Sequence, residues 1–322
     1  WYDNNKRILP WRVSQKSQRS QYYRILSEFM LQQTQVKTVI PYFDNFVKKI
    51  PNLKALSITN SKKILKMWEG LGYYRRVKNL HKTAKILVKN YKSKIPNKFD
   101  EIKKLPGVGD YTANALLAIV YNQPRIPFDG NVKRVFSRLF NKNFEKDKLA
   151  KKSIFFKYFY TKRNGDLAEA LMEFGAIICS PSNPLCDVCS LKNNCYFFKN
   201  KTSIVISKKR KEKKRKYNVY CYLKKKKKEI ALTKNKDFGF LNSFNTPEIE
   251  IAKSNSKKNN GWIYLCTYKN NLSNVKMDIN LFYKFSRNMP TKYKWHSIDR
   301  PNNEFIPSFT KKIFRKITAV YN

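Results

Sequence analysis

The chain has 322 residues, enough for two domains of ordinary size that each bury a hydrophobic core. Its 68 Lys and Arg residues against 22 Asp and Glu residues give a formal net charge of +46, so nucleic acid is the first partner to consider. Lysine-rich compositional drift, as in an AT-rich genome, explains the same excess without any binding. No run of about 18 consecutive apolar residues occurs, so we expect no membrane-spanning helix.

Residues 1–200 have the apolar periodicity of helices. The stretch 20–50 has apolar residues at helical spacing and is predicted to be interrupted at Pro41. Residues 58–91 predict two further helices, separated at Gly70 and Gly72. Residues 166–179 predict another helix, which ends at a loop rich in cysteine.

The composition changes after Cys195. Eight of the nine residues in KKRKEKKRK, at 208–216, are basic, which predicts a solvated linker or a basic arm. Strands are predicted over 217–223, 229–234, 262–268 and 275–285, and an amphipathic helix over 308–317. The second half is therefore expected to be a smaller α+β domain.

The stretch LPGVGDYTANALLAIV, at 105–120, joins a tight turn to an apolar helix. A turn that contains Gly107 and Gly109 can direct several backbone N–H groups, at the positive end of a helix, toward one anion. Glycine suits this task because a Cβ would block the close approach and the unusual dihedral angles. A DNA phosphate fits such a site, but a plain helix-joining turn fits the same residues.

Several motifs together resemble one family. LPGVG followed by a helix, and then FDGNVKR at 128–134, resembles the helix-hairpin-helix and Gly/Pro-Asp signature of the DNA glycosylase superfamily that includes endonuclease III. MutY-type adenine DNA glycosylases are matched more closely by LPWR at 9–12, SEFMLQQTQVKTVIPYF at 27–43, WEGLGYYRRVKNLHK at 68–82 and FGAIIC at 174–179. The resemblance covers about residues 1–200, and the remainder only weakly.

This resemblance implies a fold and three segments. Residues 1–200 would form a mainly α helix-hairpin-helix glycosylase region, with two helical lobes and an iron–sulfur loop at 179–195. Residues 201–216 would be a basic linker. Residues 217–322 would form a Nudix-like α+β domain that recognises the mispair, although its catalytic Nudix box is absent, so pyrophosphate hydrolysis is not expected.

Four of the six cysteines lie within seventeen residues, namely Cys179, Cys186, Cys189 and Cys195. Without a recognisable secretory signal, a metal site is a better interpretation of this group than a disulfide framework. Four thiolates suit either a tetrahedral metal such as zinc or a cubane cluster. The six-two-five spacing resembles the 4Fe–4S loop of the endonuclease III and MutY families, which implies a 4Fe–4S cluster, with zinc or metal-free thiols as alternatives.

The implied reaction is hydrolysis of the N-glycosidic bond of adenine mispaired with 8-oxoguanine or guanine, a step of base-excision repair. Such a reaction needs an acid for the leaving base and a carboxylate for the cationic sugar. Glu28 lies in an apolar helix face that would raise its pKa, and Asp129 follows the turn. Alternatively, Glu28 is an exposed helix residue and Asp129 only caps a helix.

Tyr111 occupies the position at which bifunctional relatives of endonuclease III have a nucleophilic lysine. A phenol cannot form a Schiff base, so we predict a monofunctional glycosylase that leaves an abasic site, with Tyr111 orienting Asp129 or a water molecule. The alternatives are an endonuclease III-like lyase acting on oxidised pyrimidines and a non-catalytic DNA-binding relative.

The resemblance also implies residues that contact DNA. Gln33 and Tyr73 would wedge beside the target pair after the base is flipped out. The adenine pocket would be lined by Arg7, Trp11, Arg12 and Glu173. For Tyr73 and Trp11, packing in the core is the alternative.

In the second domain, Ser273 is the candidate contact to 8-oxoguanine. The family's Phe-Ser-His loop is replaced there by LSN at 272–274, which removes an aromatic ring and an imidazole. Alternatively, this domain only adds basic surface.

We expect a monomer that binds double-stranded DNA carrying A:8-oxoguanine or A:G mispairs, with no membrane association. The expected location is the bacterial cytoplasm, in association with the nucleoid. Because the sequence opens on Trp1 rather than Met, we expect that residues before it are missing.

Overall fold

The computed structural model describes residues 1–14, 17, 19–144, 161–200, 213–234, 244–252, 261–272, 275–287, 291–299 and 305–321. The chain divides into two compact units. The first comprises Trp1–Ser61 and Arg76–Lys208, and the second comprises Lys62–Arg75 and Lys209–Asn322. The segment Lys62–Arg75, which the sequence assigns to the helical half, thus groups with the C-terminal residues. No helix among the described residues is both long and apolar enough to cross a membrane.

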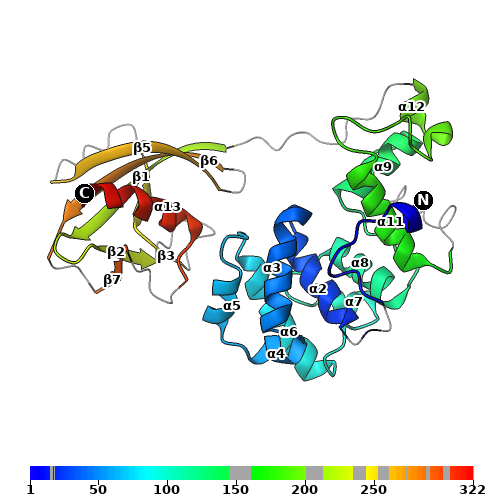
Figure 1. The fold of residues 1–322 in the computed structure, drawn as a ribbon, viewed down its shortest axis with the longest axis horizontal. Coiled ribbons are helices and arrows are strands. Elements are labelled where there is room, and N and C mark those ends of the chain that lie inside the picture. The colour runs from blue at the N-terminus through cyan, green and yellow to red at the C-terminus, as the bar shows by residue number, and fades with distance from the viewer. Residues whose placement is uncertain are drawn as a thin grey trace. The chain divides into compact units, whose positions relative to one another are not determined.

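The first unit is helical where it is described, as the sequence predicts (Figure 1). In chain order its helices are α1 (Tyr2–Asn5), α2 (Ser20–Leu31), α3 (Val36–Lys49), α4 (Leu53–Ile58), α6 (Arg75–Asn90), α7 (Phe99–Lys103), α8 (Asp110–Tyr121), α9 (Gly130–Phe140), α11 (Asn164–Ile177), η1 (Lys192–Asn194) and α12 (Tyr196–Asn200).

The prediction that Pro41 interrupts the helical stretch 20–50 is wrong. Pro41 lies inside α3, and the chain instead leaves the helical conformation at Gln32 and Gln33, where Gln33 has a φ of +60°. A proline within a helix removes one backbone hydrogen bond. Here the helix persists because Val39 and Phe43, on either side of Pro41, are fully buried.

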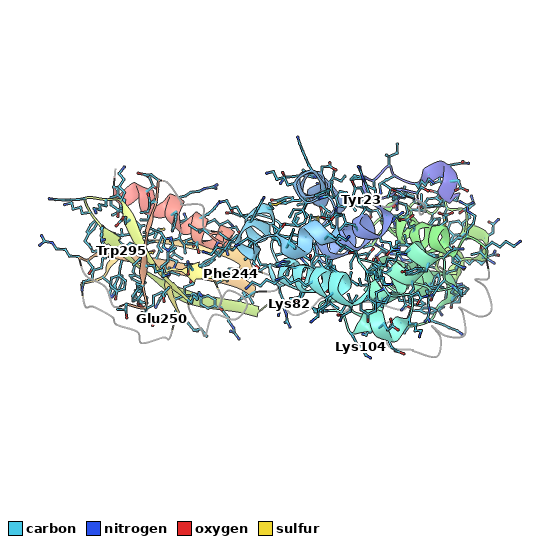
Figure 2. The ribbon with its side chains drawn as sticks, turned by 90° about the horizontal axis from the view of Figure 1, so that it is seen from below. Tyr23, Lys82, Lys104, Phe244, Glu250 and Trp295 are labelled. Atoms are coloured by element: carbon cyan, nitrogen blue, oxygen red, sulfur yellow. The ribbon has the colours of Figure 1, made fainter. Side chains whose placement is uncertain are left out.

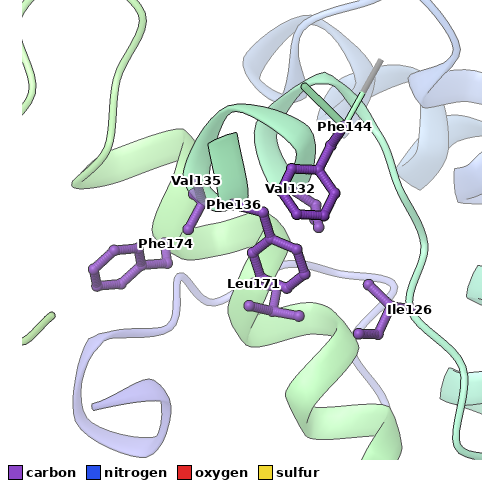
Figure 3. Close-up of a cluster of buried hydrophobic side chains, with 7 residues drawn as sticks. All are labelled: Ile126, Val132, Val135, Phe136, Phe144, Leu171 and Phe174. Atoms are coloured by element: carbon purple, nitrogen blue, oxygen red, sulfur yellow. The ribbon is translucent and has the colours of Figure 1, made fainter. Parts of the chain in front are cut away.

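One core cluster joins α9 to α11. Figure 3 shows its apolar side chains pointing toward one another, from Ile126, Val132, Val135, Phe136, Phe144, Leu171 and Phe174. Full burial of such a side chain stabilises the fold by roughly 1.5–3 kcal/mol. The two helices approach closely at Gly175, where an added Cβ would lie 2.6 Å from Asn131 Cβ. This packing fixes α9, and with it the residues at its first turn.

The second unit combines α5 (Ser61–Met67) with a mixed sheet and a C-terminal helix. Its described strands are β1 (Lys213–Lys224), β2 (Glu229–Lys234), β3 (Asn245–Thr246), β4 (Glu248–Ile251), β5 (Ile263–Leu272), β6 (Val275–Phe285) and β7 (Lys294–Ser297), followed by α13 (Ser308–Ile317) and η3 (Thr318–Val320). The segment 62–75 belongs to this unit through contacts such as Tyr74 with Phe244 and Phe305, whose ring centroids lie 5.3 and 4.7 Å away.

The sheet has the order β3-β2-β1-β6-β5, with β4 paired to β1 and β7 paired to β2. β1 and β6 run parallel, and the other pairs are antiparallel. The four predicted strands and the last helix are confirmed. β1 begins earlier than predicted, inside the basic run, because residues 213–216 pair with 275–278 of β6. The alternation predicted for β6 holds, since Met277, Ile279 and Leu281 are buried.

Candidate active site

The glycine turn at 105–109 joins α7 to α8 as a helical hairpin. Gly107 has a φ of +81°, and an added Cβ would lie 2.8 Å from Asn79 Cβ and 2.9 Å from a ring carbon of Phe29, so only glycine fits. Gly109 differs, because its φ of −97° is ordinary and, apart from its two chain neighbours, no atom of the described residues lies within 4 Å of an added Cβ. The predicted need for special dihedral angles therefore holds at Gly107 and is wrong at Gly109, where only the approach of a ligand would require glycine.

Glu28 lies toward the C-terminal end of α2 and is 7% exposed, so the alternative of an exposed helix residue is wrong. Burial raises the pKa of its carboxyl group from 4.5 to about 7. A hydrogen bond with Tyr111 and the charge of Arg24 act against this rise, and the charges of Asp129 and Glu169 add to it. Its Oε2 atom is buried without a hydrogen-bond partner among the described residues. Glu28 is thus a carboxyl group that holds a proton near neutral pH, with one oxygen available to a ligand.

Asp129 caps the N-terminus of α9, so the capping alternative is correct as a description of its structure. Its Oδ1 accepts a hydrogen bond of 2.7 Å from the Val132 N–H, and its Oδ2 accepts one of 2.9 Å from Asn131 Nδ2. Burial raises the pKa of Asp129, and these hydrogen bonds act in the opposite direction. Capping leaves a catalytic role open, because it fixes the carboxylate in one orientation.

Tyr111, in the first turn of α8, interacts with both carboxyl groups. Burial raises the pKa of its hydroxyl well above 10, and the charges of Glu28 and Asp129 raise it further. The hydroxyl also lies 3.3 Å from the Met172 sulfur, a weak acceptor. The structure therefore brings Glu28, Asp129 and Tyr111 into one electrostatic group. Tyr111 itself offers no amine.

A hydrogen-bond chain that sequence patterns do not indicate connects Asp129 to the cysteine loop. Asn131, which donates to Asp129, accepts a hydrogen bond of 2.8 Å from the Arg134 guanidinium. Arg134 in turn donates to the carbonyl oxygens of Gly175 and Cys179, both at 2.7 Å. The role of Arg134 depends on contacts with residues that are distant in sequence, so residue spacing alone does not reveal it.

The residues predicted to line an adenine pocket form an ion-pair network. Glu173 is 2% exposed and accepts hydrogen bonds from Arg7 Nε at 2.6 Å and from an Arg12 nitrogen at 2.8 Å. Although burial opposes it, these hydrogen bonds lower the pKa of Glu173 to about 2. Arg7 and Arg12 also line a cleft of about 610 Å³, which contains neither Glu28 nor Asp129 in its walls.

Trp11 is 4% exposed and packs edge-on against Phe43, with ring centroids 5.3 Å apart. The core-packing alternative therefore describes its position. Its predicted contact with a base stays a prediction.

Comparison with known proteins now identifies the family. Residues 26–155 match the model of the HhH-GPD superfamily base excision DNA repair proteins. An adenine DNA glycosylase of Buchnera aphidicola subsp. Baizongia pistaciae is 35% identical over an alignment that covers 98% of this chain and 94% of the relative. The chain belongs to the adenine DNA glycosylase family. A second Buchnera aphidicola relative with that name, from subsp. Schizaphis graminum, is 35% identical and covers 80% of this chain and 70% of the relative.

Solved structures agree with this family on the fold. A thermostable thymine-DNA glycosylase matches 62% of the chain, and 91% of its own, with a TM-score of 0.55 and 26% identity. A non-covalent complex of endonuclease III with DNA matches 59% of the chain, and 89% of its own, with a TM-score of 0.50 at 21% identity. The helical fold predicted for the N-terminal part of the chain is thus confirmed where the structure describes it.

The two residues predicted to wedge beside the target pair are exposed, and both have a positive φ angle. Gln33, in the first unit, has a φ of +60°, and Tyr73, in the second unit, has a φ of +47°. Non-glycine residues rarely adopt this left-handed conformation, which is enriched at functional sites. Tyr73 is 42% exposed, so the core-packing alternative is wrong for it.

The four cysteines expected to hold a cluster in this family line one small cavity, together with Arg138 and Lys192. Arg138 donates to Cys179 Sγ at 3.3 Å and to the carbonyl oxygens of Ser180 and Pro181, and Cys195 Sγ donates to the Arg138 carbonyl oxygen at 3.6 Å. Among the described residues, no three of His, Cys, Asp and Glu are arranged to hold a single metal ion. Four cysteine side chains that line one cavity are a donor set of the kind that holds an iron–sulfur cluster.

The predicted 8-oxoguanine contact, Ser273, lies outside the described residues. The adjacent strands β5 and β6 are described up to Leu272 and from Val275. The role of Ser273 therefore stays a prediction.

Proposed function

We propose that this chain hydrolyses the N-glycosidic bond of adenine mispaired with 8-oxoguanine or guanine in duplex DNA and leaves an abasic site. The observation that carries the proposal is the contrast between two neighbouring carboxyl groups. Glu28 is buried, with a pKa of about 7 and a free oxygen, while both oxygens of Asp129 accept hydrogen bonds. Two carboxyl groups whose environments differ in this way suit an acid and an anion.

In the proposed reaction, Glu28 donates its proton to a ring nitrogen of the extruded adenine, so that the base leaves as a neutral molecule. The bond between the sugar and the base breaks with its electron pair on the base. The positive charge that develops on the sugar is stabilised by the carboxylate of Asp129. Water then adds to the sugar carbon and gives a proton to the carboxylate of Glu28, which restores the acid and yields the abasic site.

The proposed enzyme is monofunctional. Strand cleavage by a lyase mechanism requires an amine that attacks the sugar carbon and forms a Schiff base. Tyr111 stands at the position expected for that amine and hydrogen-bonds with Glu28 instead. Because Tyr111 interacts with Glu28 and Asp129 and supplies no amine, its presence favours a hydrolase over a lyase.

The proposed DNA contacts follow the same resemblance. The N–H groups after Gly107 and Gly109 would bind a phosphate, Gln33 and Tyr73 would wedge beside the target pair, and Arg7, Trp11, Arg12 and Glu173 would line the adenine pocket. Exposed lysines such as Lys82 and Lys104 extend from the first unit and would add non-specific phosphate contacts (Figure 2).

We also assign a 4Fe–4S cluster to Cys179, Cys186, Cys189 and Cys195. When bound, it would supply a rigid cross-link for the loop that carries Lys192. Arg138 and Lys192 would offset the negative charge of the four thiolates. Residues 217–322 would act as a Nudix-like domain that recognises the base opposite adenine, through Ser273. We propose a monomer in the bacterial cytoplasm, associated with the nucleoid.

The test is product analysis on a duplex with one adenine opposite 8-oxoguanine, and on the same duplex with guanine opposite adenine. We expect free adenine and an intact strand that breaks only on later treatment with alkali. A covalent adduct trapped by borohydride, or release of oxidised pyrimidines instead of adenine, would identify a lyase. No release of any base, with DNA binding retained, would identify a non-catalytic relative.

A further inference from the structure

A buried arginine lies one turn before Glu28 on α2. Arg24 and Glu28 are four residues apart, so their side chains project from the same face of the helix. Each residue is 7% exposed. A guanidinium buried this deeply is unfavourable unless a carboxylate compensates its charge, so Arg24 needs a carboxylate partner.

The compensating carboxylate is Glu169 of α11. An Arg24 nitrogen forms a salt bridge with Glu169 Oε1. Glu169 Oε1 also accepts a hydrogen bond of 3.3 Å from Arg12 Nε, and its Oε2 accepts one of 2.7 Å from the Tyr2 hydroxyl. Both oxygens are therefore engaged, and the carboxylate is fixed beside Arg24.

The two charges act on Glu28 in opposite directions. Arg24 favours the ionised form of Glu28, and Glu169 favours the protonated form. The other titratable groups that face Glu28 are Tyr111 of α8 and Asp129 at the start of α9. Arg24 Nε and Glu28 Oε2 are each buried without a hydrogen-bond partner among the described residues, and Arg24 acts on Glu28 through its charge.

We propose that Arg24 and Glu169 are a pair of positioning residues that keeps Glu28 protonated: the salt bridge holds α2 against α11, and Glu169 cancels the field that Arg24 would otherwise exert on Glu28. Neither residue touches the substrate in this account. The inference rests on the proposed function, in which Glu28 supplies a proton to the leaving base. It adds a requirement for charge balance between two helices that are distant in sequence.

The experiment follows single-turnover adenine release against pH in the full chain. Glu169→Gln leaves Arg24 uncompensated, so the midpoint of the alkaline limb should fall by about one pH unit, a tenfold loss of protonated Glu28 above that midpoint. Arg24→Met leaves Glu169 uncompensated, so the midpoint should rise by about one unit. The double variant should return close to the parent midpoint, and Arg24→Lys, which keeps the charge, should leave it unchanged.

Asp166→Asn is the matched control. Asp166 lies on the same helix as Glu169 and forms an exposed salt bridge with Arg163. Removing its charge should leave the midpoint at the parent value. A shift as large as that of Glu169→Gln would show that any charge on α11 has the effect, and would overturn the pairing.

A second readout separates this inference from the proposed function. Carboxyl ¹³C NMR titration of Glu28 in the same variants needs neither DNA nor activity. A parent chain that releases no adenine refutes the proposed function, while opposite shifts of the Glu28 midpoint still support the pair. Shifts in the same direction, or none, overturn the inference even in an active enzyme. If the single variants melt at a much lower temperature, the Glu28 midpoint of the double variant is the test. A midpoint close to the parent value supports the inference, and one far from it overturns the inference.

Discussion

The two carboxyl groups of the candidate site are held by regions of opposite character. The C-terminal part of α2 buries Glu28 and leaves its Oε2 atom without a hydrogen-bond partner among the described residues. The start of α9 gives Asp129 a backbone N–H and an amide as donors. A buried carboxyl group with few donors retains its proton, whereas one at a helix N-terminus is stabilised as an anion. This difference supports our proposal that Glu28 is the acid and Asp129 the anion, with burial raising the pKa of both groups.

The largest expected effect is on Glu28. Glu28→Gln keeps the shape of the side chain and removes the proton that can be donated, so adenine release should fall at least about 1,000-fold, within the range of general acid catalysis. Single-turnover assays on the mispaired duplex measure this, with Glu101→Gln on the surface of α7 as a control of unchanged rate. A Glu28→Gln variant that retained parent activity would break the comparison.

The next effect separates charge from capping at Asp129. Asp129→Asn keeps a good N-cap, so stability should stay within about 0.5 kcal/mol while activity falls about 100-fold or more. Asp129→Ala loses the cap as well, and its unfolding free energy should fall by about 1 kcal/mol. Chemical denaturation and adenine release, measured on both variants, check the two expectations. Equal activities in Asp129→Asn and the parent would leave capping as the only role of Asp129.

The pH dependence of the parent enzyme sharpens the assignment of the acid. Glu28 must be protonated to act, and its pKa is about 7, so the rate of adenine release should be level at lower pH and then fall tenfold per pH unit above 7. Single-turnover rates between pH 5.5 and pH 9, at constant ionic strength, measure the limb. A rate that rose through pH 7 would show that Glu28 acts as a base.

The last expected effect is on stability rather than on activity. Because the pKa of Glu28 is raised on folding, its contribution to stability is fully present below about pH 4.5 and is lost as the pH rises through about 7. Glu28→Gln stays neutral, so it should be more stable than the parent above pH 7 by up to about 3 kcal/mol, and the gain should vanish below pH 4.5. Unfolding free energies at pH 4.5 and pH 8 test this. A difference in unfolding free energy between Glu28→Gln and the parent that is the same at both pH values would contradict the raised pKa of Glu28.

The sequence predicts the features whose causes are local. The apolar face around Glu28 predicts its burial and its raised pKa, the alternation in 275–285 predicts β6, and LPGVG predicts the turn that only glycine can make at Gly107. Each can be recognised from residues that are close in sequence, through periodicity and turn chemistry, although Gly107 meets the distant Asn79 and Phe29, and Tyr111 and Asp129 act on Glu28.

The features that were missed depend on contacts between distant segments. Arg134 matters because its guanidinium reaches carbonyl groups of Gly175 and Cys179, and Gly175 matters because Asn131 packs against it. The sequence predicts a helix break at Pro41, because proline is the stronger local signal. The helix instead breaks at Gln33, because the buried face of α3 outweighs the cost of Pro41. Pattern analysis has no access to such tertiary compensation.

The parallel pairing of β1 with β6 has a consequence for how the second unit folds. The two strands at the middle of the sheet are separated in sequence by β2, β3, β4 and β5. Closing so long a loop costs conformational entropy before the ladder forms, so we expect slow, late assembly of this sheet. During synthesis β1 leaves the ribosome without its main partner, and the lysines in its first residues then serve as charges that discourage aggregation of an unpaired strand.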